Sequence, residues 1–349
     1  MKVKSIAVAG FLAAMLPVMS IGGKTAAAAD LNVYMPQGVV APVEKVIVPI
    51  MRDKFNTKVV ITPVLSGQAL TKAVAQRTNP EVSVFMLDEG PWLQGKKANL
   101  WDKLDGVASL GEVPARFRDA DGMGSGFLLY LLGLLYDEKA YADAKLPPPT
   151  SYEDLWKPEV KGKVTISDAN STFSYALLFK INELQGGNAE QTVDPGFAKL
   201  AQLAPNIGVF HGGASTLIPL FSQRQAWIGF NASFPAQRLA ADGVPIRWVA
   251  PKEGAIAVVS YIAMAKNAPN AEAARQFINL VLSADYQAVQ TEMAFGGYVN
   301  PNTKLKPEFV EKFLIKPADI EKASLMPWEV YLNKRTELSG RWQREIEKK

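Results

Sequence analysis

Three short apolar segments near the start of the chain decide the predicted fold: Leu-Asn-Val-Tyr-Met-Pro (31–36), Lys-Val-Val-Ile-Thr-Pro (58–63) and Val-Ser-Val-Phe-Met-Leu (82–87). Each is short and rich in β-branched or large apolar residues, which is typical of a buried strand. Apolar residues with helical spacing follow the first segment, and a second helix is expected over 69–76. The order β-α-β-α-β builds a parallel sheet with helices on its faces, so we predict an α/β fold.

The rest of the chain continues this pattern. The run Phe127–Tyr136 is broken only by Gly133 and is too short to span a membrane, so it predicts a buried strand. Further predicted strands are 163–167, 226–230 and 256–263, and further helices are 173–184 and 270–282. Two capping signals are expected, a capping box of Thr150 with Glu153 and an N-cap at Ser283. No internal repeat or low-complexity linker is visible, which favours two lobes that exchange chain.

Composition excludes several kinds of chemistry. The 349 residues include one His and no Cys, which excludes disulfides, thiol nucleophiles and metal sites built on several His or Cys. A Ser-His-Asp triad would need His211, and the Gly-rich stretch 122–126 fits neither the nucleophile elbow nor the dinucleotide fingerprint. We therefore expect a protein that is not an enzyme, with no catalytic residue, metal or cofactor. The formal net charge of +4 is small for this length and does not by itself indicate a nucleic-acid partner.

The N-terminus predicts an export signal over residues 1–29. Lys2 and Lys4 precede the apolar run 6–21, and Ala27 and Ala29 satisfy the small-x-small rule for cleavage near Ala29. The alternative, a membrane anchor, is disfavoured because the run is short and ends in an Ala tract. Removal of the segment, which carries three lysines and no acid, lowers the net charge to +1. An exported chain without Cys fits a bacterial periplasm.

Small and hydroxylic residues stand at three predicted strand-to-helix joints. Free backbone N–H groups at a helix N-terminus bind anions, and ligands of open α/β sheets lie at the carboxyl ends of the strands. The alternative is that each joint is an ordinary helix cap. The binding candidates from these joints are Gly67, Gln68, Ser171, Thr172, Gly213 and Ser215.

Aromatic and acidic residues add three further candidates. Tyr34 and Trp92 lie near predicted strand ends and are candidates for an aromatic wall, with core packing as the alternative. Asp88 ends a predicted strand, where its carboxylate could meet a ligand amino group.

Several segments in the same order resemble the periplasmic solute-binding proteins of bacterial ABC importers. The resemblance is to the type II proteins of extracellular solute-binding family 1, in the branch with the polyamine, iron and thiamine binders. The segments that carry it are 79–88, 133–137, 146–156, 161–164, 249–255 and 268–274, together with Gly67-Gln68. It implies two lobes, each a mostly parallel sheet flanked by helices, joined by two hinge crossings near 127–136 and 248–256. Lobe one would hold 30–131 and 255–302, and lobe two 132–254 and 303–349.

The resemblance also implies capture of a solute between closing lobes and its delivery to a membrane permease. The protein is expected to be a monomer and to bind no nucleic acid. Asn231, Ser260 and Tyr261 join the candidate site on this basis.

The ligand class is predicted from a difference between this chain and the polyamine binders. Polyamine binders have an aromatic residue and an acid where this chain has Val258 and Ser260. We therefore predict a small carboxylate-bearing or amino-acid-like solute, with its carboxylate on the amides around Gly67, Ser171 or Gly213. Polyamine binding by the same mechanism stays open, as does a different class, an exported protein-interaction module.

Overall fold

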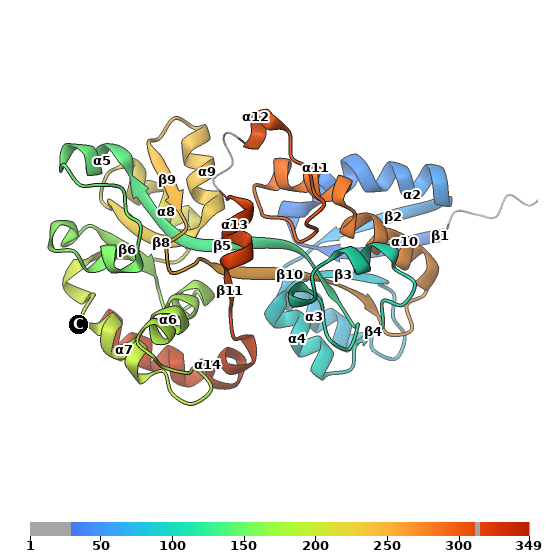
Figure 1. Ribbon diagram of the computed structural model, residues 1–349. Helices are drawn as coiled ribbons and strands as arrows, with labels where there is room; N and C mark the ends of the chain where they lie inside the picture. The colour runs from blue at the N-terminus through green and yellow to red at the C-terminus, as the bar shows by residue number, and fades with distance from the viewer. Residues whose placement is uncertain (1–28, 311–314, 349) are drawn as a thin grey trace, which may run out of the picture.

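The computed structural model describes residues 29–310 and 315–348 (Figure 1). The predicted export signal falls almost wholly outside these residues. Among the helices in the described part of the chain, none has the length and apolar character needed to cross a membrane.

The first half-sheet is built by the three segments that the sequence singled out. Strands β1 (Ala29–Met35), β2 (Thr57–Pro63) and β3 (Val84–Asp88) run parallel in the order β2-β1-β3. The connecting helical segments are η1 (Gln37–Val39), α1 (Val40–Pro42), η2 (Val43–Ile47), α2 (Val48–Phe55), α3 (Ser66–Ala75) and α4 (Glu89–Lys97). The predicted β-α-β-α-β order is confirmed.

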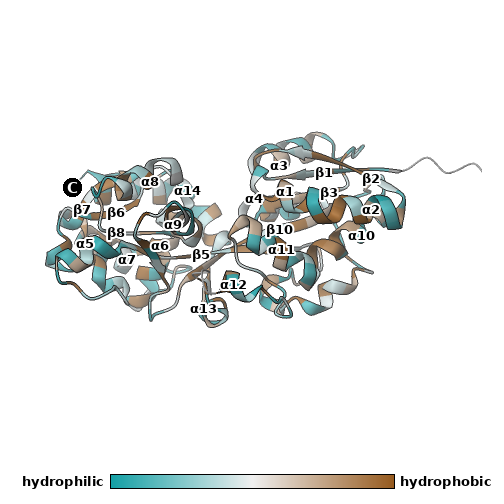
Figure 2. Cartoon of the chain, turned by 90° about the horizontal axis from the view of Figure 1, so that it is seen from above, coloured by the Kyte–Doolittle hydropathy of each residue, from teal (hydrophilic) through white to brown (hydrophobic). Residues whose placement is uncertain are grey.

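Two long strands connect the two halves of the molecule. β5 (Ser125–Asp137) and β10 (Ile256–Ala265) pair antiparallel, and every residue of β10 is buried. Figure 1 shows both strands passing between the halves. In the view from above, hydrophobic strands fill the middle of each half (Figure 2). The second crossing strand begins at Ile256, because residues 246–249 form β9 (Ile246–Val249) alongside β5 and a turn with Gly254 follows.

The second half-sheet also ends on parallel strands. β6 (Val164–Ser167) pairs parallel with β7 (Ile207–His211) and with β8 (Ile228–Ala232). β7 was not predicted. It is a short strand that contains a glycine, and Gly208 and Val209 are exposed, so its sequence lacks the strong apolar run of the other strands. The helices of this half are α5 (Glu138–Asp143), η5 (Tyr152–Trp156), η6 (Pro158–Val160), α6 (Thr172–Leu184), α7 (Asp194–Ala201), η7 (Ala204–Asn206), α8 (Ala214–Ser222) and α9 (Ser233–Ala241).

The capping box before η5 lies one residue later than predicted. Ser151, not Thr150, is the N-cap, and Asp154, not Glu153, completes the box. Asp154 Oδ2 accepts from the backbone N–H groups of Thr150 at 2.7 Å and of Ser151 at 2.9 Å. The shorter Asp side chain can do this because the turn is a tight 3₁₀ helix. The predicted cap at Ser283 is confirmed, since its side chain accepts from Tyr286 N.

The C-terminal part returns first to one half and then to the other. After β10 come α10 (Ala271–Leu282), α11 (Ala284–Ala294), α12 (Pro307–Val310) and α13 (Pro317–Lys322). Three short elements precede β5 in the chain: β4 (Trp101–Asp102), η3 (Ala108–Glu112) and η4 (Ala115–Phe117). Arg116 Nη1 donates to the Glu321 carbonyl at 2.9 Å, and Ile320 and Phe117 line the same pocket. α13 therefore contacts lobe one, while Lys316 and Asp319 at its start line a second pocket with Trp248 and Lys252, so the predicted lobe boundary at residue 303 stays a prediction.

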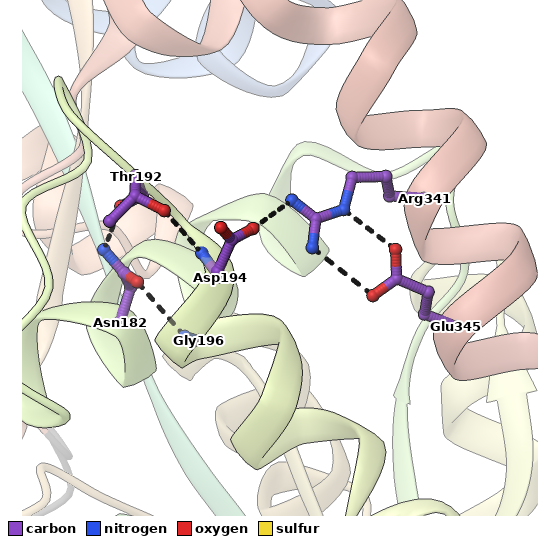
Figure 3. Close-up of polar contacts among 6 residues, drawn as sticks. All are labelled: Asn182, Thr192, Asp194, Gly196, Arg341 and Glu345. Carbon is purple, nitrogen blue, oxygen red and sulfur yellow. Dashed lines mark hydrogen bonds and ion pairs between the residues drawn. The ribbon is translucent and has the colours of Figure 1, made fainter.

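A third, short passage then leads to lobe two. β11 (Ser324–Leu325) pairs with the first residues of β10, and α14 (Trp328–Trp342) and η8 (Gln343–Glu347) follow. Figure 3 shows how this end is held: Arg341 Nη1 donates to Asp194 at 2.7 Å, and its Nε donates to Glu345 at 2.8 Å. Asn182 supports the same turn by donating to the Thr192 carbonyl at 2.9 Å.

Gly133 of β5 is required by close packing. A Cβ at this position would lie 2.7 Å from the Val249 carbonyl oxygen and 2.7 Å from the Trp248 ring. We predict that Gly133→Ala lowers the free energy of unfolding by about 1–3 kcal/mol in urea titrations, because a closely packed strand must shift. The matched control is Gly38→Ala, where a Cβ would meet nothing within 4 Å. Equal effects of the two substitutions would contradict this account of the crossing strand.

Candidate functional site

The two half-sheets turn the carboxyl ends of their parallel strands toward each other. Asp88, the last residue of β3, pairs with Ser260, which pairs with Leu128 of β5. Ala232, the last residue of β8, pairs with Leu132, four residues further along β5. At about 3.3 Å per residue, the two edges lie about 13 Å apart along the strand. This separation is measured along the strand direction, and it leaves room for a small solute between the two edges.

The lobe-one edge presents a carboxylate held by two hydroxyl groups. Ser66 Oγ donates to Asp88 Oδ2 at 2.9 Å and accepts from the Asp88 backbone N–H at 3.0 Å. Ser260 Oγ approaches Asp88 Oδ1 at 3.5 Å, the limit of hydrogen-bond distance. Asp88 is exposed and takes part in none of the ion pairs found among the described residues. This carboxylate is therefore free to receive a cation.

An aromatic pair forms the floor between the edges. Tyr130 lies on β5 midway between Leu128 and Leu132. Its ring meets the ring of Phe234 edge-on, with the two centroids 5.4 Å apart. Phe234 comes from the first turn of α9 in lobe two. Burial, with a smaller effect of Asp88, raises the pKa of Tyr130 to about 12, so its hydroxyl stays neutral.

The lobe-two edge is built by the ends of β6, β7 and β8. Its buried members are Ser167, His211 and Asn231, and His211 Nε2 lies 3.5 Å from Ser167 Oγ and 3.4 Å from Asn231 Nδ2. Asn231 Oδ1 accepts from Ala232 N at 2.8 Å, which leaves its Nδ2 to donate to the ring. The ring proton is thereby assigned to Nδ1. Burial, partly offset by Asp168, lowers the pKa of His211 to about 4, so the ring is neutral at pH 7.

Helix N-termini supply amide donors at both edges. Ser171 caps α6 by accepting from Phe173 N at 3.2 Å, with Thr172 as the first helical residue. α8 begins after Gly213, whose φ of 154° is one that L residues rarely adopt. No side chain caps α8 or α3. These amides and their partial positive charge favour an anion.

The remaining predicted residues divide between edge and interior. Gly67 and Gln68 are exposed in the first turn of α3, and Ser215 is exposed in the first turn of α8. Tyr34 lies near the end of β1, half-buried, with Lys72 Nζ 5.0 Å from its ring centroid. These positions agree with a site at the strand ends, which stays a prediction.

Trp92 and Tyr261 do not line the gap. Their rings stack at 4.1 Å inside lobe one, with Trp92 only 4% exposed. The expectation of an aromatic wall at Trp92 is therefore wrong: its ring packs against Gly124, where a Cβ would lie 2.5 Å from Nε1. The aromatic residues of the gap are Tyr130 and Phe234, which the sequence reasoning missed. The alternation of β5 side chains gave no signal, because nearly all its residues are apolar.

Glu89 is a second carboxylate beside Asp88, in a different environment. Its Oε2 and the Nε1 of Trp328 are both buried, and the Trp328 N–H is the side-chain donor that faces this carboxyl group. Trp328 begins α14 and lies against Gly90, where a Cβ would be 2.7 Å from its ring. Burial raises the pKa of Glu89 to about 8, with the Trp328 indole offsetting part of the effect. Glu89 is thus largely protonated at neutral pH.

Known proteins share this arrangement and parts of this sequence. The model of a family described as bacterial extracellular solute-binding protein matches residues 45–323. The chain is 29% identical over 198 residues to the spermidine/putrescine-binding periplasmic protein of Escherichia coli (strain K12), which covers 56% of this chain and 52% of that protein. The chain thus spans about half the length of that relative.

Two further likenesses extend over most of the chain. The gamma-aminobutyric acid-binding protein of Pseudomonas aeruginosa is 28% identical over 343 residues, covering 94% of this chain and 89% of that protein. The crystal structure of an ABC transporter from Clostridium perfringens has a TM-score of 0.80 at 23% identity, covering 90% of this chain and 99% of that one. At this identity the structural likeness supports the fold, a type II periplasmic binding protein.

Because Glu89 is protonated in the folded state, it makes the free energy of unfolding depend on pH. The folded state binds a proton that the unfolded state releases above a pKa of 4.5, so this residue lowers stability as pH rises from about 4.5 to 8. We predict that Glu89→Gln raises the free energy of unfolding by about 3–4 kcal/mol at pH 8 and changes it little at pH 4.5. Urea titrations at several pH values measure this, with exposed Glu159→Gln as the control. A pH-independent difference would refute the assignment.

Proposed function

Because the chain belongs to the bacterial extracellular solute-binding proteins, we propose that it is the periplasmic solute-binding component of an ABC importer. It captures a small polar solute between its two lobes and delivers it to a permease in the inner membrane. It acts as an exported monomer and performs no catalysis. The gap between the two strand edges, joined by the two crossing strands, supports this role because such lobes close by a hinge motion.

We propose further that the solute carries a primary amino group and an anionic group. The observation that carries this proposal is the Asp88 carboxylate, exposed, without an ion-pair partner among the described residues, and held by Ser66. It suits an ammonium group, because a charge-assisted hydrogen bond needs a fixed acceptor. At the lobe-two edge, the uncapped start of α8 suits a carboxylate.

The neutral Tyr130 and Phe234 rings would pack against the aliphatic part of such a solute. The name of the Pseudomonas aeruginosa relative, which matches nearly the whole chain, is consistent with a solute of this class.

A polyamine is the second candidate, and one observation favours it. Asp168 follows β6 at the lobe-two edge, so each edge of the gap has one carboxylate. A diamine would then bridge the two acids. Against it, Val258 is buried and Ser260 carries no charge, so the crossing strand contributes no acid. The Escherichia coli relative is named for spermidine and putrescine binding, which is consistent with a polyamine solute.

A ligand panel separates these solutes. We expect calorimetry to detect gamma-aminobutyrate or a similar ω-amino acid, and small-angle scattering to show a smaller radius of gyration on binding because the lobes close. Putrescine and spermidine are the comparison ligands. Binding of polyamines alone would overturn the amino-acid assignment. A partner protein bound with no solute binding would instead indicate an interaction module.

Substitutions test the two ends of the site separately. Asp88→Asn should weaken binding of an amino-acid ligand by about 10- to 100-fold, because it removes the charge from one ionic hydrogen bond. Exposed Asp53→Asn, on α2 and paired with Arg52, is the control and should leave affinity unchanged. Ser171→Ala combined with Ser215→Ala should weaken binding of the carboxylate end while the chain stays folded, with a melting temperature a few degrees lower because Ser171 caps α6. Unchanged affinity in the double variant would remove these joints from the site.

A further inference from the structure

A pocket outside the gap lies between α6 and the passage to α14. Its volume is about 350 Å³, and its walls include Phe179, Lys180, Glu183, Ile256, Leu325 and Met326. Lys180 stands nine residues after Ser171 on α6, which places it about 13 Å along the helix from the strand-end edge. No residue of the candidate solute site lines this pocket.

Lys180 is a buried ammonium with weak compensation. Its side chain is 4% exposed, and its one partner among the described residues is Glu183. The distances from Nζ to the two Glu183 oxygens are 3.3 and 3.4 Å, longer than the 2.7–2.9 Å typical of a good charge-assisted hydrogen bond. A lysine ammonium has three donors, and burial makes each unfilled donor costly. A better acceptor in this pocket would therefore bind favourably.

Glu183 is easily displaced. Its side chain is 60% exposed, so it can turn into water at small cost, because ion pairs with an exposed member contribute little. The walls beside Lys180 are mixed. Phe179 and Ile256 are apolar and buried, Leu325 is 38% exposed, and Asn188 and Ser324 add polar groups. One cation beside these apolar residues matches a ligand that has one negative charge and a hydrocarbon body.

We propose that this pocket is a second binding site, separate from the solute site, for a small aliphatic monocarboxylate whose carboxylate takes the place of Glu183 on Lys180. The hydrocarbon body covers Phe179, Ile256 and Leu325. The pocket holds a few carbon atoms and leaves no second cation for a dicarboxylate, so one charge is the expected limit.

Titration with hexanoate tests the site on the full mature chain. Calorimetry or amide chemical shifts should show saturable binding with a Kd of about 1 mM or tighter, with hexylamine as a probe of the opposite charge that should not bind here. Lys180→Met should weaken hexanoate binding at least about tenfold, while Lys180→Arg retains it. Glu183→Gln should tighten binding several-fold, because the competing carboxylate is gone.

Controls separate this site from the gap. Asp88→Asn should leave hexanoate binding unchanged, and melting temperatures should show that each variant is folded. No saturable binding, equal binding by Lys180→Met, or loss of binding in Asp88→Asn would each overturn the proposal. Weaker binding in Glu183→Gln would overturn the displacement of Glu183. Hexanoate binding that is unchanged in Lys180→Met but lost in the Ser171→Ala, Ser215→Ala variant would place hexanoate in the gap and overturn the proposal.

Discussion

The antiparallel pairing of β5 with β10 is the constraint on which the molecule depends. Their backbone hydrogen bonds run from Ser125 to Leu132 on one strand and from Ile256 to Ile262 on the other, with every β10 residue buried. Because the same two strands belong to both half-sheets, they fix the distance between the two edges where parallel strands end. Asp88 on one side and Ala232 on the other are thereby placed in register through shared partners.

The chemistry of the gap follows from that register. Strand ends bring together residues that are far apart in sequence, such as Ser66, Asp88 and Ser260. At the lobe-one edge the Asp88 carboxylate lies near the start of α3, and at the lobe-two edge the starts of α6 and α8 supply backbone N–H donors. The Tyr130 and Phe234 rings lie between the two edges. Glu89, next to Asp88 in the chain, is buried, and burial raises its pKa enough to leave it largely protonated at neutral pH.

Much of the fold was predictable because apolar runs and turn residues are local signals. The strands at 31–36, 58–63 and 82–87, the crossing run 127–136 and the cap at Ser283 all appear in the structure. β7 was missed because it is short and Gly208 and Val209 within it are exposed. Trp92 was misplaced because sequence does not say which face of α4 meets Gly124. Tyr130 and Phe234 could not be paired, since their contact depends on long-range packing. Asp88 and Ser260 were both candidates from the sequence, while the contacts of Ser66 and Ser260 with the Asp88 carboxylate needed the assembled sheet.

Trp328 gives the molecule an internal spectroscopic reporter. Its indole lies against Gly90 of α4, while the rest of α14 is fastened to lobe two through residues such as Arg341. Any rotation of one lobe against the other changes what surrounds this ring and how near it lies to the Glu89 carboxyl group. Intrinsic tryptophan emission therefore follows the angle between the lobes without an attached dye, and a Trp328→Phe chain supplies the baseline.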